Sequence, residues 1–87
     1  MTELRLRHEG VAWKEVDGEI VALDEQAAVY LAANPAGALL WRTLAGGTTR
    51  EALVAELMSE YGIERDRADA DTDAFLRDLS ERGLLDG

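Results

Sequence analysis

The sequence predicts an α+β fold in which an N-terminal three-stranded antiparallel sheet is followed by three helices. Two observations support this prediction. Strand-like alternation and turn residues are confined to residues 4–33, whereas capping residues and helix-ending glycines punctuate the rest of the chain. The 87 residues are expected to form one domain, residues 1–87, because a chain of this length buries one modest core.

A β-hairpin provides the first two strands of the predicted sheet. Val11 and Trp13 lie two residues apart, on one face of a strand. Asp17-Gly18 supplies the two positions of positive φ that a type I′ turn requires, and residues 19–23 form the returning strand. The two strands are therefore expected to pair antiparallel.

Residues 27–33 are predicted to form the third strand, because Asn34-Pro35 cuts this alanine-rich stretch too short for a stable helix. In a meander, this strand has one edge bonded to its neighbour and one edge free. The stretch contains no charge and no proline, which are the features that normally protect a free edge. Three candidates for covering it remain: the third helix, a second copy of the chain in a homodimer, or a foreign peptide that adds a strand.

The first two helices are predicted from their end signals. Asn34-Pro35 is a good start for a helix over residues 35–45, and Gly46-Gly47 ends it. The sequence Thr48-Thr49-Arg50-Glu51 matches a capping box, in which the threonine hydroxyl and the glutamate carboxylate each satisfy a free backbone amide. This second helix ends at Gly62.

The third helix is predicted to begin at Asp66, as its cap, and to end at Gly83. Residues 84–87 follow as a mostly apolar tail, which we expect to pack against the core. The residues of the three helices expected to face the core are Leu40, Trp41, Leu44, Leu53, Val54, Leu57, Met58, Tyr61, Ala68, Thr72, Phe75, Leu76 and Leu79.

The chain offers almost no catalytic chemistry, and we predict that it is not an enzyme. It has one histidine and no cysteine, so disulfides, thiolate catalysis and zinc–thiolate sites are excluded. His8 lies between Arg7 and Glu9 and is interpreted as a solvated histidine. Ser59 lacks the preceding aspartate that marks the attachment serine of a small acidic carrier protein.

A run of aspartates at positions 66, 69, 71 and 73 opens the third helix. Alternating oxygen ligands resemble a calcium loop, but such a loop needs a glycine at its sixth position and a glutamate at its twelfth. Counted from Asp66, those positions hold Asp71 and Arg77. We therefore interpret the run as a solvated acidic helix start, with a charged rim for a basic partner as the alternative, and we expect no metal and no cofactor.

The net charge of −9 indicates which classes of partner the protein can bind. A sheet followed by three helices is similar to a winged helix-turn-helix, so a winged-helix DNA-binding regulator is an alternative. Residues 51–87 hold eleven acidic and four basic side chains, the wrong sign for entering a DNA groove. Neither nucleic acid nor membrane is expected as a partner. The start of the chain lacks the apolar segment of a secretory signal, and we expect a cytoplasmic location.

The order of these features resembles the PqqD family over nearly the whole chain. The segments that carry the resemblance are Val11-Ala12-Trp13, Asp17-Gly18, the alanine-rich stretch 27–33, Asn34-Pro35-Ala36-Gly37-Ala38-Leu39-Leu40-Trp41, Gly46-Gly47-Thr48, the helix over residues 51–61 and residues 75–85. Among the branches of the family, the chain is most similar to the lasso-peptide leader-binding (B1-type) proteins. It departs from the family at Tyr30 and the paired alanines, where many relatives carry a lysine-leucine-asparagine run.

The resemblance implies a winged helix-turn-helix-like recognition element for ribosomally made, post-translationally modified peptides (RiPPs). Such an element binds the leader segment of a precursor peptide antiparallel to the third strand, in a cleft walled by the third helix. The residues implied to bind the leader are Ala28, Val29, Tyr30, Leu31, Asp71, Ala74, Phe75 and Asp78. The implied partner is a transglutaminase-like leader peptidase, and the alternative within the family is a PqqD-like chaperone for a radical-enzyme peptide maturase.

Overall fold

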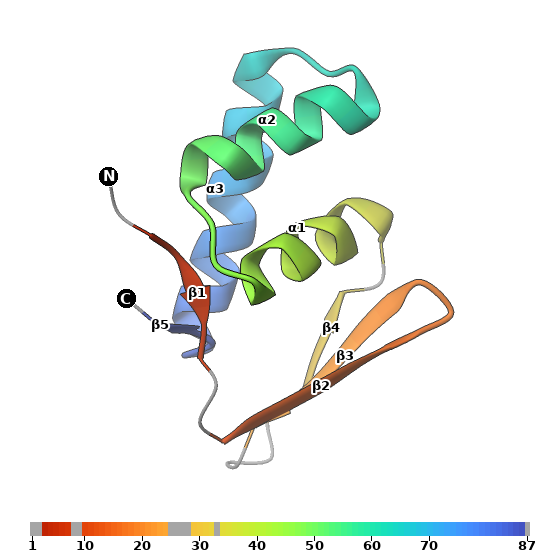
Figure 1. Ribbon diagram of the computed structural model, residues 1–87, viewed down its shortest axis with the longest axis vertical. Coiled ribbons are helices and arrows are strands. Elements are labelled where there is room, and N and C mark those ends of the chain that lie inside the picture. The colour runs from red at the N-terminus through yellow and green to blue at the C-terminus, as the bar shows by residue number, and fades with distance from the viewer. Residues whose placement is uncertain (1–2, 8–9, 25–28, 33, 87) are drawn as a thin grey trace.

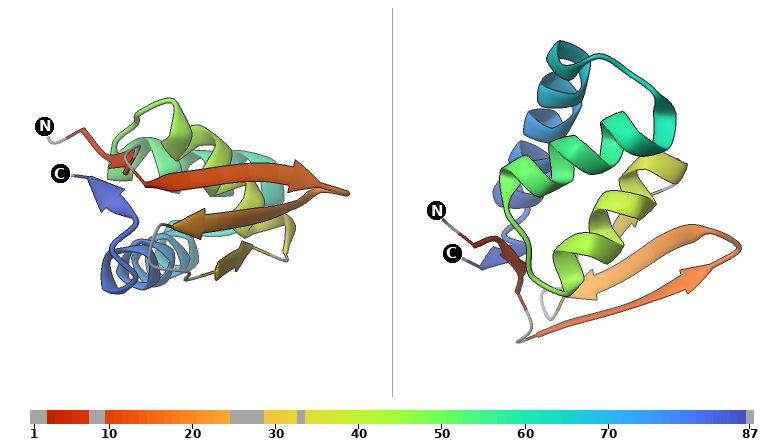
Figure 2. Two further views of the ribbon diagram at one scale, coloured as in Figure 1. Left: turned by 90° about the horizontal axis from the view of Figure 1, so that it is seen from below. Right: turned by 45° about the horizontal axis from the view of Figure 1, so that its top comes forward.

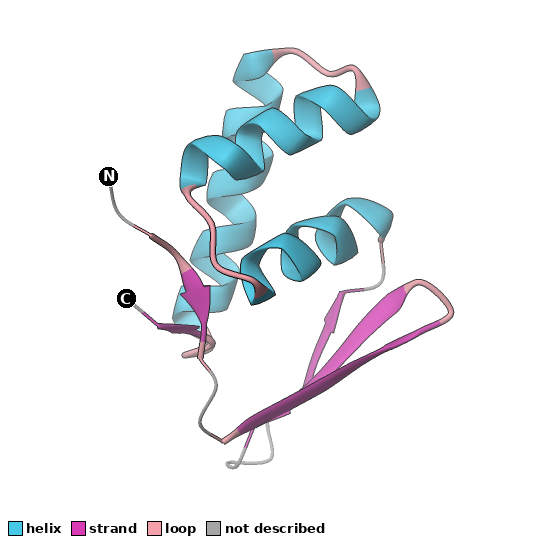
Figure 3. Cartoon of the chain, in the orientation of Figure 1, coloured by secondary structure: helices cyan, strands magenta, loops and turns pink. Residues whose placement is uncertain are grey.

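The computed structural model describes residues 3–7, 10–24, 29–32 and 34–86. The strands are β1 (Arg5–Leu6), β2 (Val11–Val16), β3 (Glu19–Asp24), β4 (Val29–Ala32) and β5 (Leu85–Asp86). The helices are α1 (Pro35–Ala45), α2 (Arg50–Tyr61) and α3 (Arg65–Glu81). Figures 1 and 3 show the helices on one side of the main sheet, with α1 between the sheet and α2. The predicted fold, an antiparallel sheet followed by three helices, is confirmed.

The main sheet is an antiparallel meander in the order β2-β3-β4. Its register places Trp13 opposite Ala22 and Ala22 opposite Tyr30, so these three side chains share one face. The hairpin turn has positive φ at Asp17 (52°) and Gly18 (81°), as the predicted type I′ turn requires. The third predicted strand is present as β4, whereas residues 27, 28 and 33 lie outside the described part of the chain.

A second, two-stranded sheet joins the two ends of the chain. β1 and β5 pair antiparallel, with Leu6 opposite Leu85, and Figure 2 shows them side by side. Leu84 is buried in the core, which confirms the predicted packing of the tail. The sequence does not predict the pairing itself, because strands of two residues carry no periodicity and each has its partner at the far end of the chain.

The start of α1 agrees with its prediction, but the start of α2 does not. The Asn34 side chain accepts a hydrogen bond from the Gly37 N–H at 2.7 Å, so Asn34 caps α1. The predicted cap of α2 is wrong by one residue: the cap is Thr49, and its hydroxyl accepts a hydrogen bond from the Ala52 N–H at 3.2 Å. The backbone of Thr48 is instead hydrogen-bonded in both directions to Leu4.

The capping box also fails at its glutamate, and the predicted cap of α3 is wrong. Glu51 does not reach back to the start of α2, because its carboxylate binds Arg65 across the inter-helix loop at 2.6 Å. α3 begins at Arg65, before Asp66, and Glu64 at its N-cap makes no side-chain capping bond. The other end of α3 agrees with the prediction, since Gly83 follows it with φ of 71°.

The core surrounds Trp41, which is fully buried on α1. The Trp41 ring stacks on Tyr30 at 5.1 Å between centroids and meets Trp13 edge-on at 5.9 Å. Most of the residues predicted to face the core are buried or half-buried, but Tyr61 is 44 % exposed. Among the described residues, no helix is long and apolar enough to cross a membrane.

Candidate functional site

A groove of about 590 Å³ lies between α3 and the segment that runs from β4 into α1. Its floor is apolar, because Leu40 of α1 and Leu57 of α2 are buried beneath it. The half-buried ring of Phe75 forms part of the wall on α3. The full set of lining residues is Tyr30, Asn34, Pro35, Ala36, Gly37, Leu40, Leu57, Tyr61, Asp71, Ala74, Phe75 and Asp78.

The groove lies beside a strand edge with unused hydrogen-bonding capacity. β4 pairs with β3 along one edge, and no other described strand pairs with it. In an antiparallel strand, alternate residues direct their N–H and C=O groups to opposite edges, so half of the β4 backbone groups point away from β3. The arrangement therefore presents an apolar hollow and a row of backbone donors and acceptors together.

The structure brings together five of the eight residues implied as the peptide-binding site. Tyr30, Asp71, Ala74, Phe75 and Asp78 all line the groove. Val29 and Leu31 belong to β4 and contribute its backbone, whereas Ala28 lies outside the described residues.

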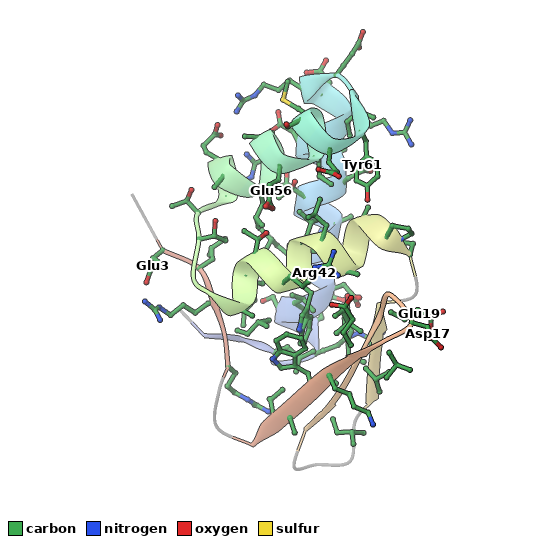
Figure 4. All side chains as sticks on the ribbon, turned by 45° about the vertical axis from the view of Figure 1, so that its right-hand side comes forward. Glu3, Asp17, Glu19, Arg42, Glu56 and Tyr61 are labelled. Atoms are coloured by element: carbon green, nitrogen blue, oxygen red, sulfur yellow. The ribbon has the colours of Figure 1, made fainter. Side chains whose placement is uncertain are left out.

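Other lining residues were not anticipated from the sequence. Residues 34–37 enter the groove because α1 begins directly where β4 ends, and Ala36 and Gly37 leave space there. Tyr61 is expected in the core, but it is the last residue of α2 and its side chain lines the groove beside the start of α1 (Figure 4). The available sequence signal for Tyr61 was its position beside the helix-ending Gly62, where a side chain easily remains exposed.

One end of the groove carries a cluster of polar groups around Tyr30. The Arg82 guanidinium carbon lies 5.4 Å from the centroid of the Tyr30 ring, and its Nε donates a hydrogen bond to Asp78 Oδ1 at 2.8 Å. Burial raises the pKa of the Tyr30 hydroxyl above its ordinary value, and the negative charge of Asp78 raises it further while Arg82 offsets part of the effect. The phenol is therefore neutral near pH 7.

Ion pairs connect α2 to α3, the helix that forms one wall of the groove. Arg50 makes a bidentate contact with Asp73, at 2.8 and 3.0 Å, and its Nη1 lies 3.4 Å from Asp69. The hydrogen bond from Arg50 lowers the pKa of Asp73, and the hydrogen bond from Arg65 lowers the pKa of Glu51. These aspartates of α3 are therefore engaged with arginines, and no three potential metal ligands come together among the described residues.

A second hollow, of about 420 Å³, continues from the groove toward the hairpin and shares Pro35 and Tyr61 with it. Three carboxylates at its rim, those of Asp17, Glu19 and Glu60, make no ion pair among the described residues. Figure 4 shows Asp17 and Glu19 at the tip of the hairpin. The surroundings of the groove are therefore negatively charged.

Two solved structures are similar to this chain. TbiB1 in complex with the TbiA(beta) leader peptide has a TM-score of 0.86 and 26 % sequence identity, with 95 % of each chain covered. Lasso peptide synthetase B1 complexed with the leader peptide has a TM-score of 0.84 and 29 % identity, with 99 % of this chain and 100 % of that chain covered. No curated protein matches the sequence significantly.

The resemblance to the PqqD family is confirmed at the level of sequence. The family model described as coenzyme PQQ synthesis protein D (PqqD) matches residues 19–85, which include β3, β4 and all three helices. Because this match spans most of the chain, the protein belongs to the PqqD family.

Proposed function

We propose that this protein is a non-catalytic recognition element, which binds the leader segment of a ribosomally made precursor peptide as an additional strand on β4. The observation that carries the proposal is the edge of β4 that no other described strand pairs with, beside an apolar groove. The two similar solved structures support it, because both are complexes with leader peptides.

Binding combines two kinds of contact. Backbone hydrogen bonds to β4 supply affinity for an extended peptide of any sequence, and the groove selects alternate side chains. Apolar peptide side chains fit over Leu40 and Leu57, beside Phe75. Ordering a flexible peptide costs conformational entropy, so we expect a Kd in the micromolar to nanomolar range, about −8 to −12 kcal/mol.

We further propose that the bound leader is presented to a separate, transglutaminase-like leader peptidase in lasso-peptide biosynthesis. The similarity to lasso peptide synthetase B1 supports this branch of the family. The second candidate is a chaperone for a radical-enzyme peptide maturase, and the matching family model, which is described by coenzyme PQQ synthesis, keeps this candidate open. The genes beside the coding sequence discriminate between them, because each function requires its own enzyme and a short precursor gene.

A titration tests peptide binding directly. The probe is the fluorescently labelled leader of the precursor encoded beside the gene, with the TbiA(beta) leader peptide as a second probe. Saturable binding of the first probe in the expected range supports the proposal, whereas no saturation up to roughly millimolar peptide, about −4 kcal/mol, overturns it. Measuring the molecular mass in solution with and without peptide shows whether a second copy of the chain occupies the edge instead.

A reconstitution tests the presentation step. The neighbouring peptidase is expected to cleave the precursor rapidly when this protein is present and slowly when it is absent. A precursor whose leader is scrambled controls for nonspecific activation. Equal cleavage rates with and without the protein contradict the presentation step and leave the binding proposal standing.

A further inference from the structure

Three side chains meet at the polar end of the groove. Tyr30 and Asp78 line the groove there, and Arg82, four residues after Asp78, does not line it. Arg82 nevertheless contacts both residues, through the 2.8 Å hydrogen bond to Asp78 and through the face of the Tyr30 ring. Any effect of Arg82 on the contents of the groove is therefore exerted through these two neighbours.

The Tyr30 ring is restrained by these contacts. It is stacked on Trp41 with an interplanar angle of 15°, and Trp41 is fully buried. Packing against both an immobile indole and a guanidinium group leaves the ring little freedom to move. Tyr30 is 7 % exposed as a result, and its ring closes this end of the groove rather than turning out of it.

The same contacts leave defined hydrogen-bonding groups for a bound peptide. Arg82 engages Oδ1 of Asp78, while Asp78 Oδ2 and the Tyr30 hydroxyl have no hydrogen-bond partner among the described residues. A carboxylate oxygen only accepts hydrogen bonds, so an ionised acidic side chain finds no donor there, and Arg82 neutralises the charge that would otherwise attract cations. This end of the groove therefore matches a neutral side chain that donates a hydrogen bond.

We propose that Arg82 is a positioning residue for peptide specificity, which holds Tyr30 and Asp78 so that this end of the groove accepts a neutral hydrogen-bond donor and rejects acidic side chains. The inference rests on the proposed function of the groove. It follows that loss of Arg82 exposes an uncompensated carboxylate and changes the preference toward basic side chains, rather than simply weakening binding.

The test compares peptide preferences among four proteins: the wild type, Arg82→Gln, Arg82→Lys and Arg77→Gln. The probe is a displayed library of all single substitutions in the leader of the neighbouring precursor. For the wild type, one leader position should be enriched in serine, threonine, asparagine and glutamine and depleted in aspartate and glutamate. For Arg82→Gln, lysine and arginine should be enriched at that position by about tenfold over the wild type, or about 1.4 kcal/mol.

The other two variants separate positioning from charge. Lysine keeps the charge but lacks the planar guanidinium, so Arg82→Lys should show no enrichment of basic residues and should recover only part of the wild-type selectivity. Arg77 is exposed on α3 and does not line the groove, so Arg77→Gln removes the same charge as a matched control and should leave the preference unchanged.

The outcomes distinguish the inference from the proposed function. If all four proteins bind the library with the same preferences, the inference is overturned and the proposed function stands. If the wild type binds no member of the library, the proposed function itself fails. Circular dichroism checks the fold of each variant, and if Arg82→Gln does not fold, wild-type selectivity in Arg82→Lys overturns the inference.

Discussion

The two outer strands of the main sheet differ in the side chains that they carry at their outer edges. β2 and β4 each pair only with β3 among the described strands. β2 carries Lys14 and Glu15 at its centre and is largely exposed, whereas β4 has the uncharged sequence VYLA and lies beside the groove. Charges on an edge strand discourage pairing with another chain. The comparison indicates that one edge is protected from added strands and the other is left open to them.

The two edges also differ in the side chains that surround them. α3 and the start of α1 stand beside β4 and provide side chains that a bound peptide can contact. No helix lines the hollow of about 150 Å³ at β2, which lies over the paired residues of β2 and β3 and is lined only by the hairpin. An added strand at β4 therefore gains side-chain contacts as well as backbone hydrogen bonds, and specificity requires both.

Proline substitutions at the two edges should produce the largest difference. Val29→Pro removes a backbone N–H from β4 and bends the edge, so we expect leader binding to weaken at least about 100-fold, or about 2.8 kcal/mol. By the alternation of the strand, the Glu15 N–H points away from β3, so Glu15→Pro makes the same change at the protected edge and should leave the Kd within about threefold. Fluorescence titration measures both variants, and equal losses of binding contradict the assignment of β4.

A substitution at Tyr30 tests the groove side of the open edge. Tyr30→Asp places a second carboxylate beside Asp78 and removes the ring that stacks on Trp41, so binding should weaken at least about tenfold, or about 1.4 kcal/mol. Tyr30→Phe keeps the ring and should retain most of the affinity. Circular dichroism should show that the helices remain folded in both. Unchanged affinity in Tyr30→Asp argues that the peptide binds elsewhere.

Removing the charges of β2 should convert the protected edge into an open one. The double variant Lys14→Val and Glu15→Val leaves an uncharged edge strand, and we expect it to associate with itself at roughly 100 µM, where the wild type does not associate through this edge. Lys14→Arg with Glu15→Asp is the matched control. Analytical ultracentrifugation gives the oligomeric state, and a monomeric valine variant contradicts the protective role of these charges.

Lowering the pH should have the smallest effect, a change in stability that comes from the ion pairs of Asp73 and Glu51 with arginines. Arginine contacts lower the pKa of Asp73 and Glu51 in the folded protein, so these groups stabilise the fold above their unfolded-state pKa values and lose that contribution as the pH falls through the lower folded values. We expect the melting temperature to decrease slightly below about pH 4.5. Arg50→Gln should reduce the part of the pH dependence of the melting temperature that comes from Asp73. An identical pH profile in this variant contradicts the role of the Arg50–Asp73 ion pair.

The predicted elements were most accurate where the deciding signals are local. The Asp17-Gly18 turn and the Asn34 cap each act within four residues, and both appear in the structure as predicted. The capping box of α2 was wrong because distant residues use its groups: Leu4 binds the backbone of Thr48, and Arg65 binds the carboxylate of Glu51. A capping motif predicts a helix start only when no other part of the fold uses the same groups.

The site shows the same division between local and distant information. Composition and pattern alone established the uncharged third strand, the acidic character and the lack of cysteine, because these depend only on which residues are present. The tertiary structure decided that Tyr61 and residues 34–37 join the groove, that Arg82 lies over the ring of Tyr30, and that β1 pairs with β5. Each of these contacts joins segments that are far apart in the chain, or depends on the angle at which one element leaves another, and the packing of the whole domain sets that geometry.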